Sequence, residues 1–247
     1  MPRLVLVHGS VVGGRGTWRE QRRTVNPETM TLAVLERPGF EPSPVSDFGR
    51  TPALPPARID FEEHATWVAD RIEPGDHLVG HSYGGVIALL AAAAVGEDLA
   101  SLTVIEPPCT RVALDDPAVA AFADRAAAFW RDGPRDDPEA FLRGFLASVG
   151  SAFDPPSPLP PALERGARAL IAERGPWEAE IPLQRLRALD LPTLVVSGAH
   201  HHAFDAICDA LERELGAERL VVAGHGHNPQ RDPRFTDALL DFVTGAE

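Results

Sequence analysis

Apolar and polar residues follow one another along this chain in short blocks, and most apolar blocks are bounded by glycine, proline or charged residues. A short continuous apolar run is typical of a strand buried on both faces of a parallel sheet. Such runs predict six strands, at residues 4–7, 31–35, 77–79, 102–105, 192–198 and 220–223. Helices are predicted between and beyond these runs at residues 17–25, 59–72, 86–95, 117–131, 138–149, 160–174, 204–215 and 233–243. This alternation favours an α/β fold.

The alternation of strands and helices stops between Cys109 and Leu191, where three predicted helices follow one another without a strand. Pro-rich breaks such as residues 154–158 separate them. We expect a helical insertion that lies over the carboxyl ends of the strands as a cap. The predicted core domain is therefore residues 1–108 and 192–247, and the predicted cap is residues 109–191. Phe129 and Trp130 are the cap residues that we expect to border a substrate pocket.

A long Pro-rich loop without periodicity is predicted from Phe40 to Pro56. Loops of this length are usually functional or mobile. Phe40, at its start, is a candidate for the wall of a substrate pocket and equally a candidate for core packing.

Length and composition fit one substantial domain, because 247 residues with 44% hydrophobic and 24% charged side chains are ordinary globular values. The net charge of −13 argues against nucleic acid or an anionic membrane as a partner, since both favour a basic face. Cys109 and Cys208 are too few for a disulfide framework. The chain opens directly on an apolar strand without a leader pattern, and no apolar run is long enough to span a bilayer. We therefore expect a cytoplasmic monomer or homodimer.

The stretch Gly80-His81-Ser82-Tyr83-Gly84 joins a predicted strand to an Ala-rich predicted helix. Glycines at the ends of this G-x-S-x-G pattern fit a turn that is too tight for side chains. A serine at the tip of such a turn is exposed at the carboxyl end of the sheet. Amides at the helix N-terminus then face an oxygen that becomes negative during acyl transfer. Ser82 is therefore the candidate nucleophile, the Tyr83 amide a candidate oxyanion donor and His81 a candidate pocket residue.

The segment His8-Gly9-Ser10 closes the first predicted strand. A glycine here lets the backbone approach an oxyanion closely, although an ordinary turn also needs one. Ser10 or Val11 would supply the second oxyanion amide, and His8 and Gly9 are candidate pocket residues.

Alternating strands and helices, the turn around Ser82, the helical insertion and the late Gly224-His225-Gly226-His227 segment together resemble the α/β-hydrolase family. The resemblance covers nearly the whole chain. It implies a three-layer, doubly wound α/β/α fold whose all-parallel six-stranded sheet has the order 2-1-3-4-5-6 and lacks the family's first two strands. The family order of nucleophile, acid and histidine assigns the base to His227, with His225 as its rival.

The acid is the point at which this chain departs from the family pattern. Most relatives carry an aspartate three residues after the glycine that ends the fifth strand here, and that position is His201. Glu106, at the end of the fourth predicted strand, occupies a location that some relatives use, and its carboxylate would orient the imidazole. We favour Glu106, with Asp205 as the alternative acid.

Three consecutive histidines, residues 200–202, raise the question of a metal site. Adjacent residues do not normally all face one ion, and no cysteine or carboxylate stands beside them at zinc-like spacing. We therefore expect no metal, and a solvated loop or a contact behind the active site instead.

The resemblance implies a serine hydrolase that cleaves an ester, thioester or related acyl bond of a small molecule through Ser82, His227 and Glu106, without a cofactor. The same residues would serve a cofactor-free perhydrolase or haloperoxidase, or a C–C bond hydrolase, because a fold does not fix a function. A catalytically silent member that binds a small molecule is the third hypothesis. Ester turnover beside peracid formation and diketone cleavage separates the enzyme hypotheses, and a tight unmodified ligand without turnover favours the third.

Overall fold

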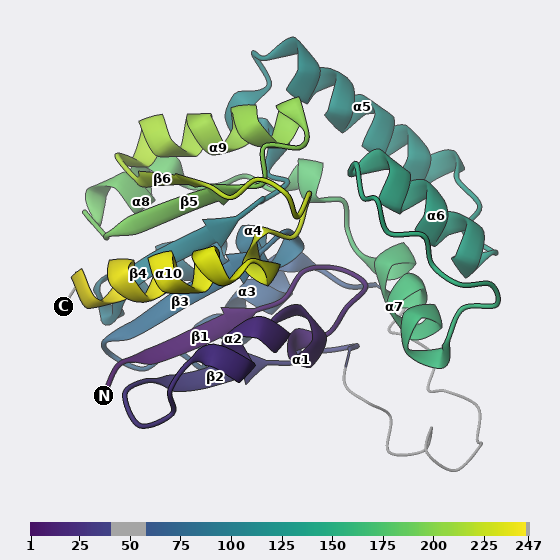
Figure 1. Ribbon diagram of the computed structural model, residues 1–247. Helices are drawn as coiled ribbons and strands as arrows, with labels where there is room; N and C mark the ends of the chain where they lie inside the picture. Colours follow the sequence, from purple (N-terminus) through teal and green to yellow (C-terminus); the bar gives the residue numbers. More distant parts are fainter. Residues whose placement is uncertain (41–57, 246–247) are drawn as a thin grey trace.

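The computed structural model describes residues 1–40 and 58–245, in which six strands form one sheet (Figure 1). Every neighbouring pair is parallel, and the order is β2-β1-β3-β4-β5-β6. The strands are β1 (Arg3–Val7), β2 (Thr31–Leu35), β3 (Asp76–His81), β4 (Leu99–Ile105), β5 (Thr193–Ser197) and β6 (Glu218–Val221). The predicted strand number, direction and order are thereby confirmed.

The register of the strands brings their carboxyl ends side by side. Val7 of β1 pairs with Gly80 of β3, and Ile105 of β4 pairs with both His81 of β3 and Val196 of β5. Because parallel strands run in one direction, the residues that follow these four strands meet at a single edge of the sheet. Residues far apart in the chain are therefore neighbours there.

The edge strand β6 lies two residues earlier than the apolar run at residues 220–223 predicted. Glu218 pairs with Leu194, and Leu220 pairs with Val196. An edge strand has a neighbour on one side only, so its polar side chains can remain in contact with solvent, and the exposed ends of β6 show that they do. Burial on both faces, the criterion behind the prediction, does not apply to this strand.

Helices cover both faces of the sheet, because successive side chains of each strand point to opposite sides. Val5 and Val7 of β1 join one core, and Leu4 and Leu6 join the other. The first face carries α3 (Phe61–Ala69), α4 (Tyr83–Val95), α8 (Leu183–Ala188) and α9 (His202–Leu215). The second face carries α1 (Gly14–Thr17), α2 (Arg19–Thr24) and α10 (Pro233–Gly245).

The predicted helices differ from the observed ones by about one to three residues at one or both ends, one of them is a pair of helices, and one helix was not predicted. The helix predicted at residues 59–72 begins at Phe61, because the Asp60 side chain accepts from the Glu62 amide and caps it, while Ile59 forms a β-bridge with Glu173. The helix predicted at residues 17–25 is instead the pair α1 and α2. Helix α8 was missed because it is only six residues long. The predicted loop at residues 40–56 lies, beyond Phe40, outside the described residues.

Between β4 and β5 the chain forms α5 (Pro117–Asp132), α6 (Pro138–Ser148) and α7 (Pro161–Ala172) before it reaches α8. Asp116 and Asp137 cap α5 and α6, and each is followed by proline at the first helical position. In Figure 1 these three helices lie beyond the carboxyl ends of the strands, at the opposite end from both termini. Within the described residues, no helix has the length and apolar character needed to cross a bilayer.

Close contacts join α7 to the loop after β1. Val11 packs in one apolar cluster with residues of α6 and α7, including Leu142 and Leu170. A Cβ at Gly166 would lie 1.9 Å from the Val11 carbonyl oxygen, so only glycine permits this approach.

A buried ion pair joins the loop after β2 to the end of the inserted segment, which is the chain from α5 to α7 between β4 and β5. Arg37, after β2, and Glu173, after α7, meet at 2.7 Å between Nη2 and Oε1, and their side chains are 0% and 1% exposed. The same guanidinium donates to the Gly9 carbonyl at 2.8 Å. The Ser10 hydroxyl donates to the second oxygen of Glu173. One carboxylate and one guanidinium thus tie the inserted segment to the loops after β1 and β2.

We predict that Glu173→Gln lowers the free energy of unfolding by about 3–5 kcal/mol, because it leaves the Arg37 charge buried without a counter-charge. Glu164→Gln is the matched control, since Glu164 pairs with Arg168 at the surface, where both side chains are about half exposed. It should cost no more than about 1 kcal/mol. Urea unfolding of both variants measures the difference, and equal losses would contradict a special role of the buried pair.

Candidate active site

Ser82 sits between β3 and α4 in a backbone conformation that ordinary residues avoid, with φ 55° and ψ −124°. Three segments crowd around it. A Cβ at Gly84 would lie 2.4 Å from the His8 carbonyl oxygen, and one at Gly80 would lie 2.3 Å from the Gly84 carbonyl oxygen. Glycine at both positions therefore allows β1, β3 and α4 to close around the turn. The side chain of Ser82 is left at the carboxyl edge of the sheet.

Ser82, His227 and Glu106 form one hydrogen-bonded row. The Ser82 hydroxyl lies 2.9 Å from Nε2 of His227, and Nδ1 of His227 lies 3.1 Å from Oε2 of Glu106. All three residues are buried. The His227 loop is fixed by its own carbonyl, which accepts from Nε2 of His81 at 2.8 Å. Burial, with His227 as a second cause, lowers the pKa of His81 to about 3, so this donor is a neutral imidazole.

Glu106 follows β4 and has a positive φ of 50°, which turns the chain at the edge of the sheet. Its Oε1 accepts from the Gly198 amide at 2.5 Å, and its Oε2 faces His227. Burial raises the pKa of Glu106 to about 7, against the lowering effect of the Gly198 amide and of His200. Burial also lowers the pKa of His227 to about 3. Because the two groups touch, a proton taken up here belongs to the pair.

Asp205, the alternative acid, is turned away from this row. Its Oδ1 accepts from the Ser197 hydroxyl at 2.7 Å and lies 3.9 Å from Nη2 of Arg219. His201, at the position of the family's aspartate, accepts from the Ala203 amide through Nδ1 at 3.2 Å and caps α9. Both residues thus serve the start of α9 and its contact with β5 and β6.

His200, one of the three consecutive histidines for which the sequence left a solvated loop or a contact behind the active site open, is a neighbour of Glu106. Its Nδ1 lies 3.5 Å from Oε2 of Glu106, and its Nε2 donates to the Val149 carbonyl at 3.0 Å. Glu106, His200 and His227 present potential metal ligands within 4.8 Å of one another. A shared cation would have to break the Glu106–His227 hydrogen bond. The signal available in the sequence was the place of His200 two residues after Gly198, beside the strand that ends at Glu106.

The backbone amides of Ser10, Val11 and Tyr83 have no hydrogen-bond acceptor within the described residues. Tyr83 begins α4, so its amide belongs to the positive end of a helix. Val11 has a positive φ of 70°, and a Cβ at Gly9 would lie 2.9 Å from Cβ of Ser82. The loop after β1 therefore comes close to Ser82 because Gly9 has no side chain.

Three predicted pocket residues, His8, Phe40 and Phe129, pack against other side chains or the backbone. His8 is buried: its Nδ1 donates to the Gly9 carbonyl at 2.8 Å, and its Nε2 accepts from the Arg37 amide at 3.0 Å. Phe40 packs edge-on against His8, with ring centroids 4.8 Å apart. Phe129 packs against Phe141 between the inserted helices. Within the described residues, none of these three, nor Gly9, borders the two cavities beside Ser82, whereas Phe40 borders a further cavity together with Val11 and Val12, so the assignment of these residues to a substrate pocket stays a prediction.

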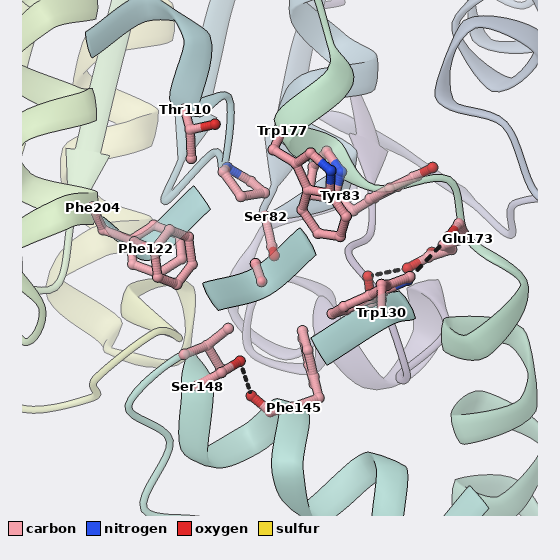
Figure 2. A pocket seen from close by; sticks show the side chains of 15 residues that line it. Ser82, Tyr83, Thr110, Phe122, Trp130, Phe145, Ser148, Glu173, Trp177 and Phe204 are labelled. Atoms are coloured by element: carbon pink, nitrogen blue, oxygen red, sulfur yellow. Dashed lines mark hydrogen bonds between the residues drawn. The ribbon is translucent and has the colours of Figure 1, made fainter. Parts of the chain in front are cut away.

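Two cavities open beside Ser82. The first, the aromatic cavity, has an empty volume of about 490 Å³ including its mouth, and its walls carry Phe122, Trp130, Phe145, Trp177 and Phe204. Figure 2 shows Ser82 between Phe122 and Phe204 on one side and Tyr83, Trp130 and Trp177 on the other. The second cavity has an empty volume of about 760 Å³, again including its mouth, and is bordered by His81, Ser82, His227 and Arg231 together with Leu142 and Leu146 of α6. Ser82 is common to both.

Comparisons with known proteins agree with this architecture. The model of the alpha/beta hydrolase family matches residues 4–239. A search of curated proteins found no significant match. Among solved structures, NosK from Streptomyces actuosus is similar at a TM-score of 0.65 and 24% identity, covering 99% of this chain and 98% of that one. An alpha/beta hydrolase from Sphaerobacter thermophilus DSM 20745 has a TM-score of 0.63 at 23% identity, with 98% and 92% covered.

A thermophilic esterase from Thermogutta terrifontis is also similar, with a TM-score of 0.59 and 21% identity over 100% of this chain and 90% of that one. At such identities the structural likeness concerns the fold. The family model, in contrast, spans the strands, the turn at Ser82 and the loop of His227. The chain belongs to the alpha/beta hydrolase family.

Proposed function

We propose that this protein is a serine hydrolase that cleaves an ester, thioester or related acyl bond of a small molecule. The observation that carries the proposal is the row Ser82–His227–Glu106 at the junction of two cavities. Serine near neutral pH is a poor nucleophile, so a base within hydrogen-bond reach is required, and Nε2 of His227 at 2.9 Å meets that requirement.

In the proposed reaction, Nε2 of His227 takes the Ser82 proton while Oγ attacks the substrate carbonyl. The Tyr83 amide and an amide of the loop after β1, from Ser10 or Val11, hold the oxygen that becomes negative. The protonated His227 then gives its proton to the leaving group, and an acyl-enzyme on Ser82 remains. Water attacks this ester by the same route and restores Ser82. Glu106 fixes the tautomer of His227 and stabilises its transient positive charge.

The two cavities suggest where the acyl group and the leaving group of a substrate bind. His227 borders only the second cavity, so the leaving group, which must receive the proton from His227, belongs there. The acyl group then occupies the aromatic cavity, whose walls come largely from α5, α6 and the segment after α7. We therefore propose residues 109–191 as a cap that determines which acyl groups fit, although α8 within this range packs on the core beside α4 and α9.

We predict that Ser82→Ala abolishes ester turnover without unfolding the protein, because glycines at positions 80 and 84 hold the turn. His227→Ala should lose nearly as much, since members of such a group act as a unit. A fluorophosphonate probe should label the wild type at Ser82 and leave both variants unlabelled, and circular dichroism checks folding. Turnover that survives Ser82→Ala would refute the mechanism.

Glu106→Gln should lower kcat by about two to four powers of ten, because it keeps the shape of the side chain but removes its charge. Asp205→Asn is the matched control and should cost little, since Asp205 bonds Ser197. Steady-state hydrolysis of p-nitrophenyl esters measures both. The reverse ranking would assign the acid to Asp205.

The pH dependence of kcat/KM should follow the Glu106–His227 pair. The pKa of Glu106 is raised to about 7, so below that pH the pair holds a proton and lacks the charged carboxylate that supports the base. We predict that kcat/KM rises as the pH increases through about 7. In Glu106→Gln this step should vanish, because the amide does not titrate. A step that persists unchanged in the variant would assign it to another group.

A further inference from the structure

The second cavity contains a charged side chain that the proposed chemistry does not use. Arg231 borders this cavity together with Ser82 and His227, and it stands only four residues after His227, in the turn Pro229–Arg231. The remaining wall is largely apolar, with Leu142 and Leu146 of α6 and Leu163 of α7. A group that leaves Ser82 through this cavity would pass along an apolar wall and reach a guanidinium.

Arg231 is an exposed residue and has no counter-charge among the residues that the structure describes. Its side chain makes no hydrogen bond or ion pair with any described residue, and the adjacent Asp232 is taken by Arg234 at 2.5 Å and by His225 at 3.4 Å. The surrounding protein displaces water from the guanidinium, and Arg19 adds a like charge nearby; both lower the pKa of Arg231. It is the only arginine of the described residues whose pKa is lowered. The chain has 36 acidic against 23 basic residues, yet none of the described acids pairs with this cation.

An anion in the second cavity would supply the counter-charge that the described residues do not give Arg231. A guanidinium that has no partner among the described residues and borders this cavity is free to bind an oxyanion, whereas an arginine already held in an ion pair is not. Its planar fork of donors matches carboxylate and phosphate oxygens, which accept two parallel hydrogen bonds. The cavity therefore suits a leaving group with an apolar body and an anionic end.

We propose that Arg231 binds a carboxylate or phosphate on the leaving group, so that the natural substrates are acyl esters or thioesters of an anionic alcohol or thiol. This inference rests on the proposed function, because it takes His227 to define the leaving-group side. It adds a substrate class that the row of Ser82, His227 and Glu106 does not specify.

The test uses three butyryl esters that share the acyl group and differ in the leaving group: 4-hydroxybenzamide, 4-hydroxybenzoate and 4-hydroxyphenyl phosphate. Wild type and variants are compared on the same ester, so the intrinsic reactivity of each ester cancels. Arg231→Gln should lower kcat/KM for the two anionic esters at least about tenfold more than for the neutral amide, mainly through KM. Arg231→Lys should lose less, since it keeps the charge. The anionic ester with the larger loss identifies carboxylate or phosphate as the better match.

Arg213→Gln is the control, because Arg213 is an exposed arginine of α9 that faces only Glu214. It should change all three esters by the same factor. If Arg231→Gln also changes all three equally while its circular dichroism is native, the inference is wrong and the serine hydrolase proposal stands.

A binding measurement separates the two proposals when no ester is turned over. Ser82→Ala protein is titrated calorimetrically with 4-hydroxybenzoate and with 4-hydroxybenzamide, and again after Arg231→Gln is added. Tighter binding of the carboxylate that is lost with Arg231 supports the anion site even if the hydrolase proposal fails. Equal affinity for the two compounds, or a preference that survives Arg231→Gln, overturns it.

Discussion

The closeness of three backbones around Ser82 is the constraint on which the site depends. Gly9, Gly80 and Gly84 each stand where a Cβ would collide with a neighbouring segment, at 2.9, 2.3 and 2.4 Å. The contacts hold Ser82 at φ 55°, ψ −124°, a conformation of the kind that costs on the order of 1–3 kcal/mol and persists only where its surroundings enforce it. The cores on both faces of the sheet supply that enforcement. Strain at Ser82 is thus a consequence of the close approach of β1, β3 and the start of α4 at these glycines.

The loop after β1 is fixed by charged groups from two other segments. Arg37 donates to the Gly9 carbonyl, and its amide donates to the His8 ring. Glu173 accepts from the Ser10 hydroxyl. Donors that are to stabilise a developing oxyanion are most effective when they need no reorganisation during the reaction. The buried Arg37–Glu173 pair therefore links the root of the inserted segment with the backbone that we propose as part of the oxyanion site.

Local patterns in the sequence located the strands and the turn at Ser82, and the resemblance to the α/β-hydrolase family supplied the order of the sheet and the pairing of Ser82 with His227. Apolar runs locate the strands. Reactive side chains that directly follow parallel strands lie close together, because the carboxyl ends of these strands share one edge of the sheet. Contacts between residues far apart in the sequence could not be predicted from local patterns. Arg37 and Glu173, for example, are 136 residues apart. For the same reason the contacts of His8 with the Arg37 amide and with the Phe40 ring could not be predicted from the sequence.

The position of Glu106 follows from the register of two strands. Ile105 pairs with Val196, so the residue after β4 lies beside the end of β5, and the Glu106 amide donates to the Val196 carbonyl at 2.9 Å. The Gly198 amide then holds the carboxylate at 2.5 Å. The Glu106 carboxylate, although it follows β4, therefore approaches His227 from beside the carboxyl end of β5. The loop after β5 carries His201, which caps α9, and His200, which lies beside Glu106.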